Sequence, residues 1–359
     1  MKIALVHDYL SEYGGAERVL KTLTEMYPEA PIYTAFCVKN STAEKQFRGK
    51  KIVESWLAPL LKIGKFYSPL RFLVPVIWQS FDLSQYDLVI TSASWYITRG
   101  FKAKKIICYC HTPPRYLYGY ETSIEWQKYW PVKVYAAIVN HFLRIYDFNE
   151  AQKINHWIAN SQEVKARIAK FYRKDAMVIY PPCDVENIIK KTEGLKKESY
   201  FLIASRLVGA KGIEEAVEAA NKLNFKLKII GEAAGYSKLK LVGRNVELLG
   251  RVSDEKLYEL YAKAKGFIAL AKEEDFGMTV IESMAAGTPV IAFYGGGFKE
   301  TVVEGITGTY VFEVSITALK QAIKRMDEIK WKRENLLSQA RKFSKENFIK
   351  KIKEYIENA

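Results

Sequence analysis

The stretch E-E-D-F-G-M-T-V-I-E-S-M-A-A-G, residues 273–287, decides the fold of this chain. The apolar residues 266–270 before it predict a short buried strand, and residues 289–293 after it predict another. Between them a helix is expected to begin at Gly277 and to end at Ala286. A strand, a helix and a second strand in succession are typical of a parallel sheet with right-handed crossovers.

The same alternation extends over most of the chain in two series. Strands are predicted at residues 2–6, 87–91, 106–110, 157–160 and 177–180, and then at 200–205, 226–230 and 246–249. Amphipathic helices follow from Ala16, Ser161, Gly212 and Ser253, where the two serines are N-caps. We therefore expect an α/β protein with two Rossmann-like, doubly wound parallel-sheet domains that face each other across a cleft.

The polar, lysine-rich residues 186–198 predict a linker between these domains. The first domain is then expected at residues 1–185 and the second at 199–339. The charged tail at about 340–359 is expected to be a helix that packs back on the first domain.

Composition supports a folded chain of two domains, because 49% of the 359 residues are hydrophobic and 26% are charged. The apolar stretches are far shorter than the ~20 residues of a membrane-spanning helix. The apolar residues 3–6 are too few for a signal peptide. The four cysteines lack disulfide or zinc-site spacing, so a reducing cytoplasm is expected.

Net charge is +15, and residues 1–182 hold 25 Lys and Arg against 15 Asp and Glu. The same half holds six of the seven tryptophans, a combination that favours a polyanion or an anionic membrane as partner. Residues 56–78, supplemented by 126–135, are predicted to lie at a membrane surface. The alternative is ordinary core aromatics with solvated lysines. Nucleic acid is not expected, because no recognisable helix-turn-helix, RRM or zinc module is present.

The carboxylates of the opening stretch are the first candidates for ligand binding. Ligands of open α/β sheets bind beyond the carboxyl ends of the strands, and a helix N-terminus such as that at Gly277 attracts anions. Glu282, on the helix, could accept two hydrogen bonds from a ribose diol, while Glu274, in the loop, could meet the other end of the ligand. The alternative is a capping acid at Glu274 and a solvated helix acid at Glu282.

Cations and glycines follow other strands. Arg206 comes just after a strand and Lys211 stands at the next helix start, an arrangement that favours a diphosphate. Gly14-Gly15 after the first strand suits close approach to phosphate or sugar, although a plain turn explains it equally well. Gly295-Gly296-Gly297 predicts the same close approach to a ligand.

His111 directly follows a buried strand and precedes a stiff Thr-Pro-Pro turn, so it is a candidate for the cleft, although a lone histidine is more often structural. His7, at the end of the first strand, could also line the cleft. Backbone groups of Gly250-Arg251-Val252 could pair with a base edge, or could form an ordinary loop. The chain has no P-loop, no G-x-G-x-x-G after a strand and no Asp-x-Asp pair, so we expect neither NTPase nor NAD chemistry, and no bound metal.

These features together resemble glycosyltransferase family 4, whose members are retaining enzymes of the GT-B fold. The resemblance rests on E-x7-E from Glu274 to Glu282, the Arg206/Lys211 pair, Gly14-Gly15, "ANS" at 159–161 and "IYPPCD" at 179–184. It covers residues 3 to about 308. The motifs "HDYL", "GGAERV" and "YCHTPPRYLY" look most like mannosyltransferases of O-antigen and exopolysaccharide assembly.

The resemblance implies roles for individual residues. Arg206 and Lys211 would bind the donor diphosphate, Glu282 the ribose, and Glu274 the donor sugar, while His111 would contact the sugar's 6-hydroxyl and the developing charge. The remaining donor contacts would come mainly from backbone groups, at Gly14, Gly15, Gly250, Val252, Phe276, Gly277, Met278 and Thr279.

The implied function is a retaining, metal-independent hexosyltransferase without cofactor that moves mannose from GDP-mannose to a glycan or a polyprenyl-diphosphate-linked acceptor in cell-surface polysaccharide synthesis. It would work in the cytoplasm, peripherally at the inner face of the membrane. Two alternatives remain open, a UDP-sugar-dependent enzyme of the same fold and a catalytically silent subunit that binds nucleotide-sugar.

Overall fold

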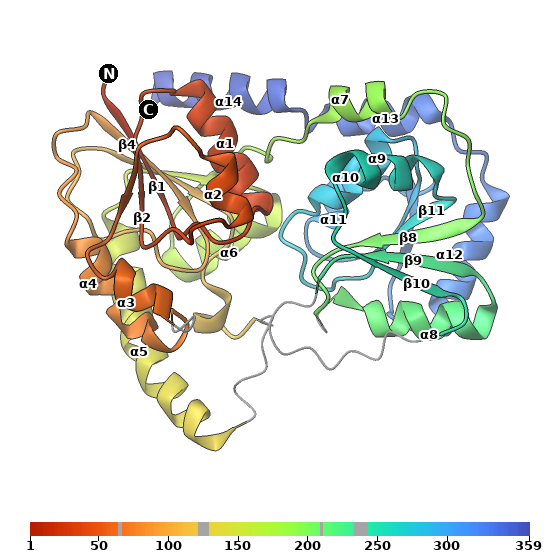
Figure 1. Cartoon of the computed structure of the whole chain (residues 1–359), viewed down its shortest axis with the longest axis horizontal. Helices are drawn as coiled ribbons and strands as arrows, with labels where there is room; N and C mark the ends of the chain where they lie inside the picture. Colours follow the sequence, from red (N-terminus) through yellow and green to blue (C-terminus); the bar gives the residue numbers. More distant parts are fainter. Residues whose placement is uncertain (64–66, 121–128, 209–210, 233–242) are drawn as a thin grey trace. The chain divides into compact units, whose positions relative to one another are not determined.

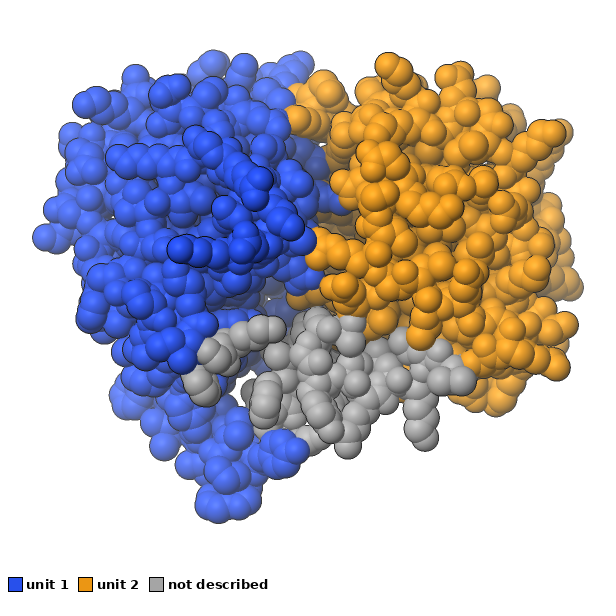
Figure 2. Space-filling view, in the orientation of Figure 1, with its two compact units in different colours: residues 1–120, 126–182, 348–359 blue, residues 121–125, 183–347 orange. Residues whose placement is uncertain are grey.

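A computed structural model describes residues 1–63, 67–120, 129–208, 211–232 and 243–359. The described residues divide into two compact units (Figure 2), unit 1 with residues 1–120, 129–182 and 348–359, and unit 2 with those of 183–347. Each unit contains one parallel sheet with helices on both of its faces (Figure 1). The predicted fold class, two doubly wound parallel-sheet domains, is confirmed.

The sheet of unit 1 is all parallel. Its strands are β1 (Ile3–His7), β2 (Ile32–Thr34), β3 (Ile52–Glu54), β4 (Leu88–Ala93), β5 (Ile106–Cys110), β6 (His156–Ala159) and β7 (Met177–Val178). They lie in the order β3-β2-β1-β4-β5-β6-β7. The chain therefore reverses its direction of travel across the sheet between β1 and β4, which is where ligands of such sheets bind.

Two apolar layers cover this sheet because successive side chains of a strand point to opposite faces. In β1, Ala4 and Val6 belong to one core cluster, whereas Ile3 and Leu5 belong to the other. The helices of unit 1 are α1 (Gly15–Met26), α2 (Thr42–Gln46), α3 (Ala58–Lys62), η2 (Pro69–Leu73), α4 (Val74–Gln79), η3 (Arg115–Leu117), α5 (Trp130–Gln152), α6 (Gln162–Tyr172) and α14 (Lys345–Asn358). Helices α1, α2 and α14 cover the face of Leu5, and α3 to α6 cover the face of Val6.

Unit 2 has the same design. Its strands are β8 (Tyr200–Ala204), β9 (Lys226–Ile230), β10 (Val246–Gly250), β11 (Gly266–Ala269), β12 (Val290–Phe293) and β13 (Gly308–Val311), in the order β10-β9-β8-β11-β12-β13. Its helices are α7 (Val185–Lys191), α8 (Ile213–Leu223), α9 (Asp254–Lys263), α10 (Met278–Ala285), α11 (Phe298–Thr301), α12 (Ile316–Glu328) and α13 (Arg333–Arg341). The travel direction reverses between β8 and β11.

Local chemistry accounts for several helix starts. Ser161 Oγ accepts a hydrogen bond from the backbone N–H of Val164 at 3.1 Å, and Ser253 Oγ accepts one from Lys256 at 3.3 Å. Both serines satisfy backbone donors that the first helical turn leaves unpaired, as the sequence predicts. None of the helices within the described residues is long and apolar enough to cross a bilayer.

The structure differs from the predicted linker, whereas the tail is helical as expected. Residues 186–191 of the expected linker belong to α7, whose Val185 and Ile188 are buried, so these residues are part of the packed structure of unit 2. Most of the tail forms α14, which belongs to unit 1 from Phe348 onward. Strands β2, β3 and β13, of three or four residues each, are absent from the sequence prediction.

The segment predicted to meet a membrane, residues 56–78, is only partly exposed. Leu61 and Trp78 are fully buried in the core of unit 1, so the prediction is wrong for them. Trp56, Leu60 and Phe72 are exposed. Residues 64–66 of this segment, and 126–128 of its proposed extension, lie outside the described residues.

Candidate functional site

The reversal point of unit 2 lies between β8 and β11, and two predicted site residues follow these strands. Arg206 comes two residues after β8 and is exposed, while Glu274 lies in the loop after β11. Because neighbouring parallel strands end at the same edge of a sheet, this edge holds both side chains.

Lys211 and Glu274 form an ion pair with 2.6 Å between Nζ and Oε2. Their side chains are 24% and 22% exposed, so the pair is accessible from solvent. The start of α8 is held close to β11, because Gly212 has φ +65° and a Cβ there would lie 2.7 Å from the Cβ of Leu270. The sequence assigns the two charges to different parts of a ligand, and the structure shows them paired with each other.

Gly277 is the N-cap of helix α10 and has φ +92°, a conformation that favours glycine. The next two residues, Met278 and Thr279, are half-buried and belong to the first turn, whose backbone N–H groups have no partner within the helix. The ring of Phe276 is buried and packs against Phe343 at 5.4 Å between centroids. Phe276 can therefore offer a ligand its backbone rather than its side chain.

The three glycines at 295–297 approach the same loop from β12. A Cβ on Gly296 would lie 2.2 Å from the backbone oxygen of Glu274, and the backbone N–H of Gly297 donates to that oxygen at 2.8 Å. These glycines therefore approach the chain's own loop closely, and their approach to a ligand stays a prediction.

Glu282 is buried, with 2% of its surface exposed, so the alternative of a solvated helix acid is wrong. The hydroxyl of Tyr261, on α9, donates to Glu282 Oε2 at 3.0 Å. Sequence reasoning missed Tyr261 as a partner, because nothing local connects two residues on different helices. The tyrosine fixes one oxygen of a carboxylate that is predicted to bind a diol.

The backbone loop predicted to meet a base follows β10, the edge strand of the sheet. Gly250 and Val252 are both half-buried, and Gly250 has φ +63°. The oxygen of Gly250 accepts a hydrogen bond from the N–H of Gly231 at 2.9 Å. The loop thus lies at the carboxyl edge of the sheet, two strands away from the strand that Arg206 follows.

In unit 1, His111 directly follows β5 and is 8% exposed. Its backbone oxygen accepts from Asn160 Nδ2 at 2.9 Å, and its N–H donates to Ala93 at 2.8 Å. Burial, with a smaller contribution from the nearby His7, lowers the pKa of His111 to about 3. His111 is therefore a neutral hydrogen-bonding group at physiological pH.

His111 is joined to the glycine pair through three other side chains. Ser92 Oγ lies 2.8 Å from His111 Nε2 and 3.1 Å from His7 Nδ1. On its other side, His7 Nε2 lies 3.2 Å from Glu17 Oε1, and Glu17 Oε2 accepts from the N–H of Gly14 at 2.9 Å. Gly14 is the N-cap of α1 with φ −123°, and its hydrogen bond to Glu17 fixes it to the first turn of that helix. Gly15 is exposed.

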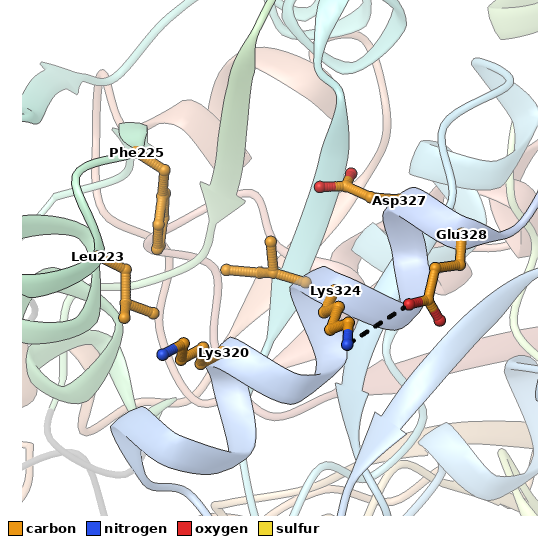
Figure 3. Close-up of a pocket in the computed structure, with 7 residues that line it drawn as sticks. Leu223, Phe225, Lys320, Lys324, Asp327 and Glu328 are labelled. Carbon is orange, nitrogen blue, oxygen red and sulfur yellow. Dashed lines mark ion pairs between the residues drawn. The ribbon is translucent and has the colours of Figure 1, made fainter.

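A hollow of about 380 Å³ lies elsewhere in unit 2, beside α12. Figure 3 shows Leu223 and Phe225 on one side and the α12 residues Lys320 and Lys324 on the other, with Lys324 paired to Glu328 at 3.8 Å. None of the residues predicted to bind a nucleotide-sugar lines it.

Comparison with known proteins gives matches over both units. The family described as Glycosyltransferase Family 4 matches residues 13–187, and the one described as Glycosyl transferases group 1 matches residues 184–343. An uncharacterised glycosyltransferase of Methanocaldococcus jannaschii is 28% identical over 52% of this chain and 54% of its own length. The chain thus spans about half the length of this relative.

Two further proteins are similar over more of the chain. The O-antigen chain mannosyltransferase RfbU of Salmonella typhimurium is 27% identical over 64% of this chain and 67% of its own length. The structure of Anabaena HepE in complex with UDP and glucose matches all of both chains with a TM-score of 0.70 at 18% identity. At that identity the structural match concerns the fold.

Proposed function

Because this chain belongs to glycosyltransferase family 4 and has the GT-B fold, we propose that it is a retaining glycosyltransferase that moves a sugar from a nucleotide-sugar to a glycan or lipid-linked acceptor. The observation that carries the proposal is the Lys211–Glu274 pair at the reversal point of the unit 2 sheet. Such an edge is where sheets of this design bind nucleotides.

The donor diphosphate is proposed to displace Glu274 from Lys211. Lys211, Arg206 and the first N–H groups of α10 then hold the diphosphate, and Glu274 becomes available to a hydroxyl of the donor sugar. Groups that are already in place stabilise the charge that develops on the leaving diphosphate without reorganising, which is the main catalytic task in this reaction. We propose that the diphosphate itself accepts the proton of the acceptor, so that no nucleophile from the protein is needed. Arg206, Lys211 and the N–H groups at the start of α10 are proposed to neutralise the diphosphate in place of a divalent metal.

Mannose from GDP-mannose is the proposed donor. It is supported by the similarity to the mannosyltransferase RfbU. The match to HepE, solved with UDP and glucose, favours the second candidate, a UDP-sugar. A silent subunit that binds a nucleotide-sugar without transferring it is the third.

Thermal stabilisation by ligands separates these candidates. A ligand that binds only the folded protein raises its melting temperature. We expect GDP and GDP-mannose to do so equally with and without EDTA, while UDP and ADP compounds do not. A rise in melting temperature with UDP compounds alone would instead support a UDP-sugar as the donor. A shift without transfer to a lipid-linked acceptor would favour the silent subunit, and the anomeric configuration of a transferred sugar tests retention.

Unit 1 is further proposed to dock on an anionic membrane, where a polyprenyl-diphosphate acceptor would be found. The support is an exposed row of apolar side chains along α5, Trp130, Val134, Ile138, Phe142 and Ile145, which we call the α5 apolar face. These residues are 50–76% exposed although each is large and apolar. Contiguous exposed apolar surface of this kind marks an interaction site.

Charge and neighbouring residues favour a lipid surface as the occupant. Both acidic residues of α5, Asp147 and Glu150, are buried, whereas Lys133 and Arg144 are exposed. The start of α5 contacts η2, because the hydroxyl of Tyr135 donates to the backbone oxygen of Pro69. Phe72, a further exposed apolar side chain, lies on the same short helix as Pro69.

Vesicle co-sedimentation tests the docking. Binding to vesicles with anionic lipid is expected to fall as salt rises, and Phe142→Ser should weaken it. Phe312→Ser is the matched control, because Phe312 is 74% exposed on unit 2 and lies outside the α5 apolar face. Absence of binding at low salt, or an equal loss in both variants, would exclude this surface.

A further inference from the structure

Four side chains from separate elements of unit 1 form a hydrogen-bonded series, Glu17 on α1, His7 on β1, Ser92 on β4 and His111 after β5. His7 and Ser92 are 1% exposed, and the side chain of Glu17 is 15% exposed. Burial excludes water as a competing partner, so each group depends on its neighbours for hydrogen bonds.

We propose that His7 is a positioning residue that, through Ser92, sets which ring nitrogen of His111 carries the proton. The inference rests on the proposed function and on the role that the family resemblance implies for His111, contact with the donor sugar. It concerns what His111 offers to that sugar, because Nε2 is occupied by Ser92 and Nδ1 is the ring nitrogen left for a ligand.

The serine hydroxyl has one proton, so it can donate to only one of the two imidazoles. When His7 is neutral and its Nε2–H donates to Glu17, its Nδ1 has a lone pair and accepts the proton of Ser92. Ser92 Oγ then accepts from Nε2–H of His111. His111 Nδ1 is left as a hydrogen-bond acceptor for a sugar hydroxyl.

When His7 takes up a proton from solvent, its Nδ1–H donates to Ser92 instead. Ser92 then turns its own proton toward His111 Nε2, and the proton of His111 moves to Nδ1 by exchange with solvent. His111 stays neutral in both states, and the number of protons rises by the one that His7 gained. Its Nδ1 changes from an acceptor to a donor.

The charges around His7 place this change within reach of neutral pH. Burial lowers the pKa of His7, but the hydrogen bond and charge of Glu17, with smaller contributions from Asp8, which follows β1, and from Ser92, raise it above the usual value. His111, the other titratable group close by, stays neutral. Protonated His7 is therefore the form favoured below neutral pH.

Nitrogen-15 NMR of the full chain, labelled at histidine, reads the tautomer directly. The chain has four histidines, so single replacements assign the signals. In the wild type we expect His111 to change from Nε2–H to Nδ1–H as pH falls. In His7→Gln the amide donates to Glu17 and accepts from Ser92 at every pH, so His111 should keep Nε2–H throughout. Equal behaviour of both proteins would overturn the proposal.

Two further variants make the result independent of how well His7→Gln folds. Glu17→Gln removes the charge that favours protonated His7, so the change in His111 should move to lower pH; an unmoved transition would count against the series. His156→Gln, outside the series, should behave as the wild type.

Transfer kinetics provide the second readout. His7→Met, which breaks the series, should lower kcat roughly ten- to hundredfold, as loss of a residue that orients a metal-bound histidine does, with a smaller change in KM. His7→Gln should keep kcat at high pH and lose the wild-type pH dependence. If the wild type transfers no sugar, the proposed function fails while the NMR result stands; unchanged kinetics in both variants would refute only the role of His7.

Discussion

Replacement of Gly277 by alanine tests whether the start of α10 is held as tightly as the structure shows. Gly277 has φ +92°, and a Cβ there would lie 2.6 Å from Cε1 of the buried Phe298. An alanine in the left-handed region costs about 1–2 kcal/mol. Forcing an extra carbon into a packed core costs about 1–3 kcal/mol more. We therefore expect Gly277→Ala to lower the free energy of unfolding by about 2–5 kcal/mol.

Gly305→Ala separates backbone strain from crowding. Gly305 lies in the same unit with φ +70°, but a Cβ there would meet no atom within 4 Å. Its replacement should therefore cost only the conformational part, about 1–2 kcal/mol. The difference between the two variants measures the contact with Phe298.

Urea unfolding followed by circular dichroism gives both free energies, and hydrogen exchange of peptides from α10 locates the effect. In Gly277→Ala the rate of hydrogen exchange should rise in α10 and also in α11, since Phe298, which the added Cβ would contact, is the first residue of α11. Nucleoside diphosphate affinity should fall as well, because the displaced helix start no longer presents its N–H groups to the phosphates. Equal destabilisation by the two variants would refute the argument, since Phe298 would then have moved aside without cost.

Three other replacements test the candidate site. Lys211→Met should weaken nucleoside diphosphate binding, measured by calorimetry, about tenfold or more, since a hydrogen bond to a charged group contributes about 1.5–3 kcal/mol. Unchanged affinity would mean that Lys211 pairs with Glu274 but does not bind the diphosphate. Glu282→Gln keeps an acceptor for Tyr261, so urea unfolding should change by less than about 1.5 kcal/mol while nucleotide affinity falls. His111 has a pKa lowered to about 3, so the unfolded chain binds a proton below pH 6.5 that the folded chain does not, and stability falls between pH 6.5 and 3. His111→Gln should remove up to about 1.4 kcal/mol per pH unit of that loss in unfolding curves, and an unchanged slope would contradict the burial of a neutral imidazole.

Elements with a clear local pattern could be predicted from the sequence. Strand β5 is found where the apolar residues 106–110 predict it, and the helix after Ser161 begins at its N-cap. Arg206 and Glu274 each follow a strand that the local pattern predicts. They lie at the same edge of the sheet because a parallel sheet brings the carboxyl ends of its strands together.

Buried polar partners could not be predicted in this way. Tyr261 and Glu282 are 21 residues apart, and His7 and Ser92 are 85 apart. The exposed side of α5 could not be predicted either, because in a helix that is apolar on most of its surface the periodicity does not indicate which residues are buried.

The alternation of most strands and helices, the family motifs and the edge of the sheet that carries them were determined by the sequence itself, since each depends on residues within one or two turns or strands. The pairing of Lys211 with Glu274, the contact of Gly296 with the loop of Glu274, and the series from Glu17 to His111 were decided only by the tertiary structure. The physical reason is that hydrogen bonds and close contacts depend on distances between atoms, and the distance between residues far apart in the chain is set by how the elements pack.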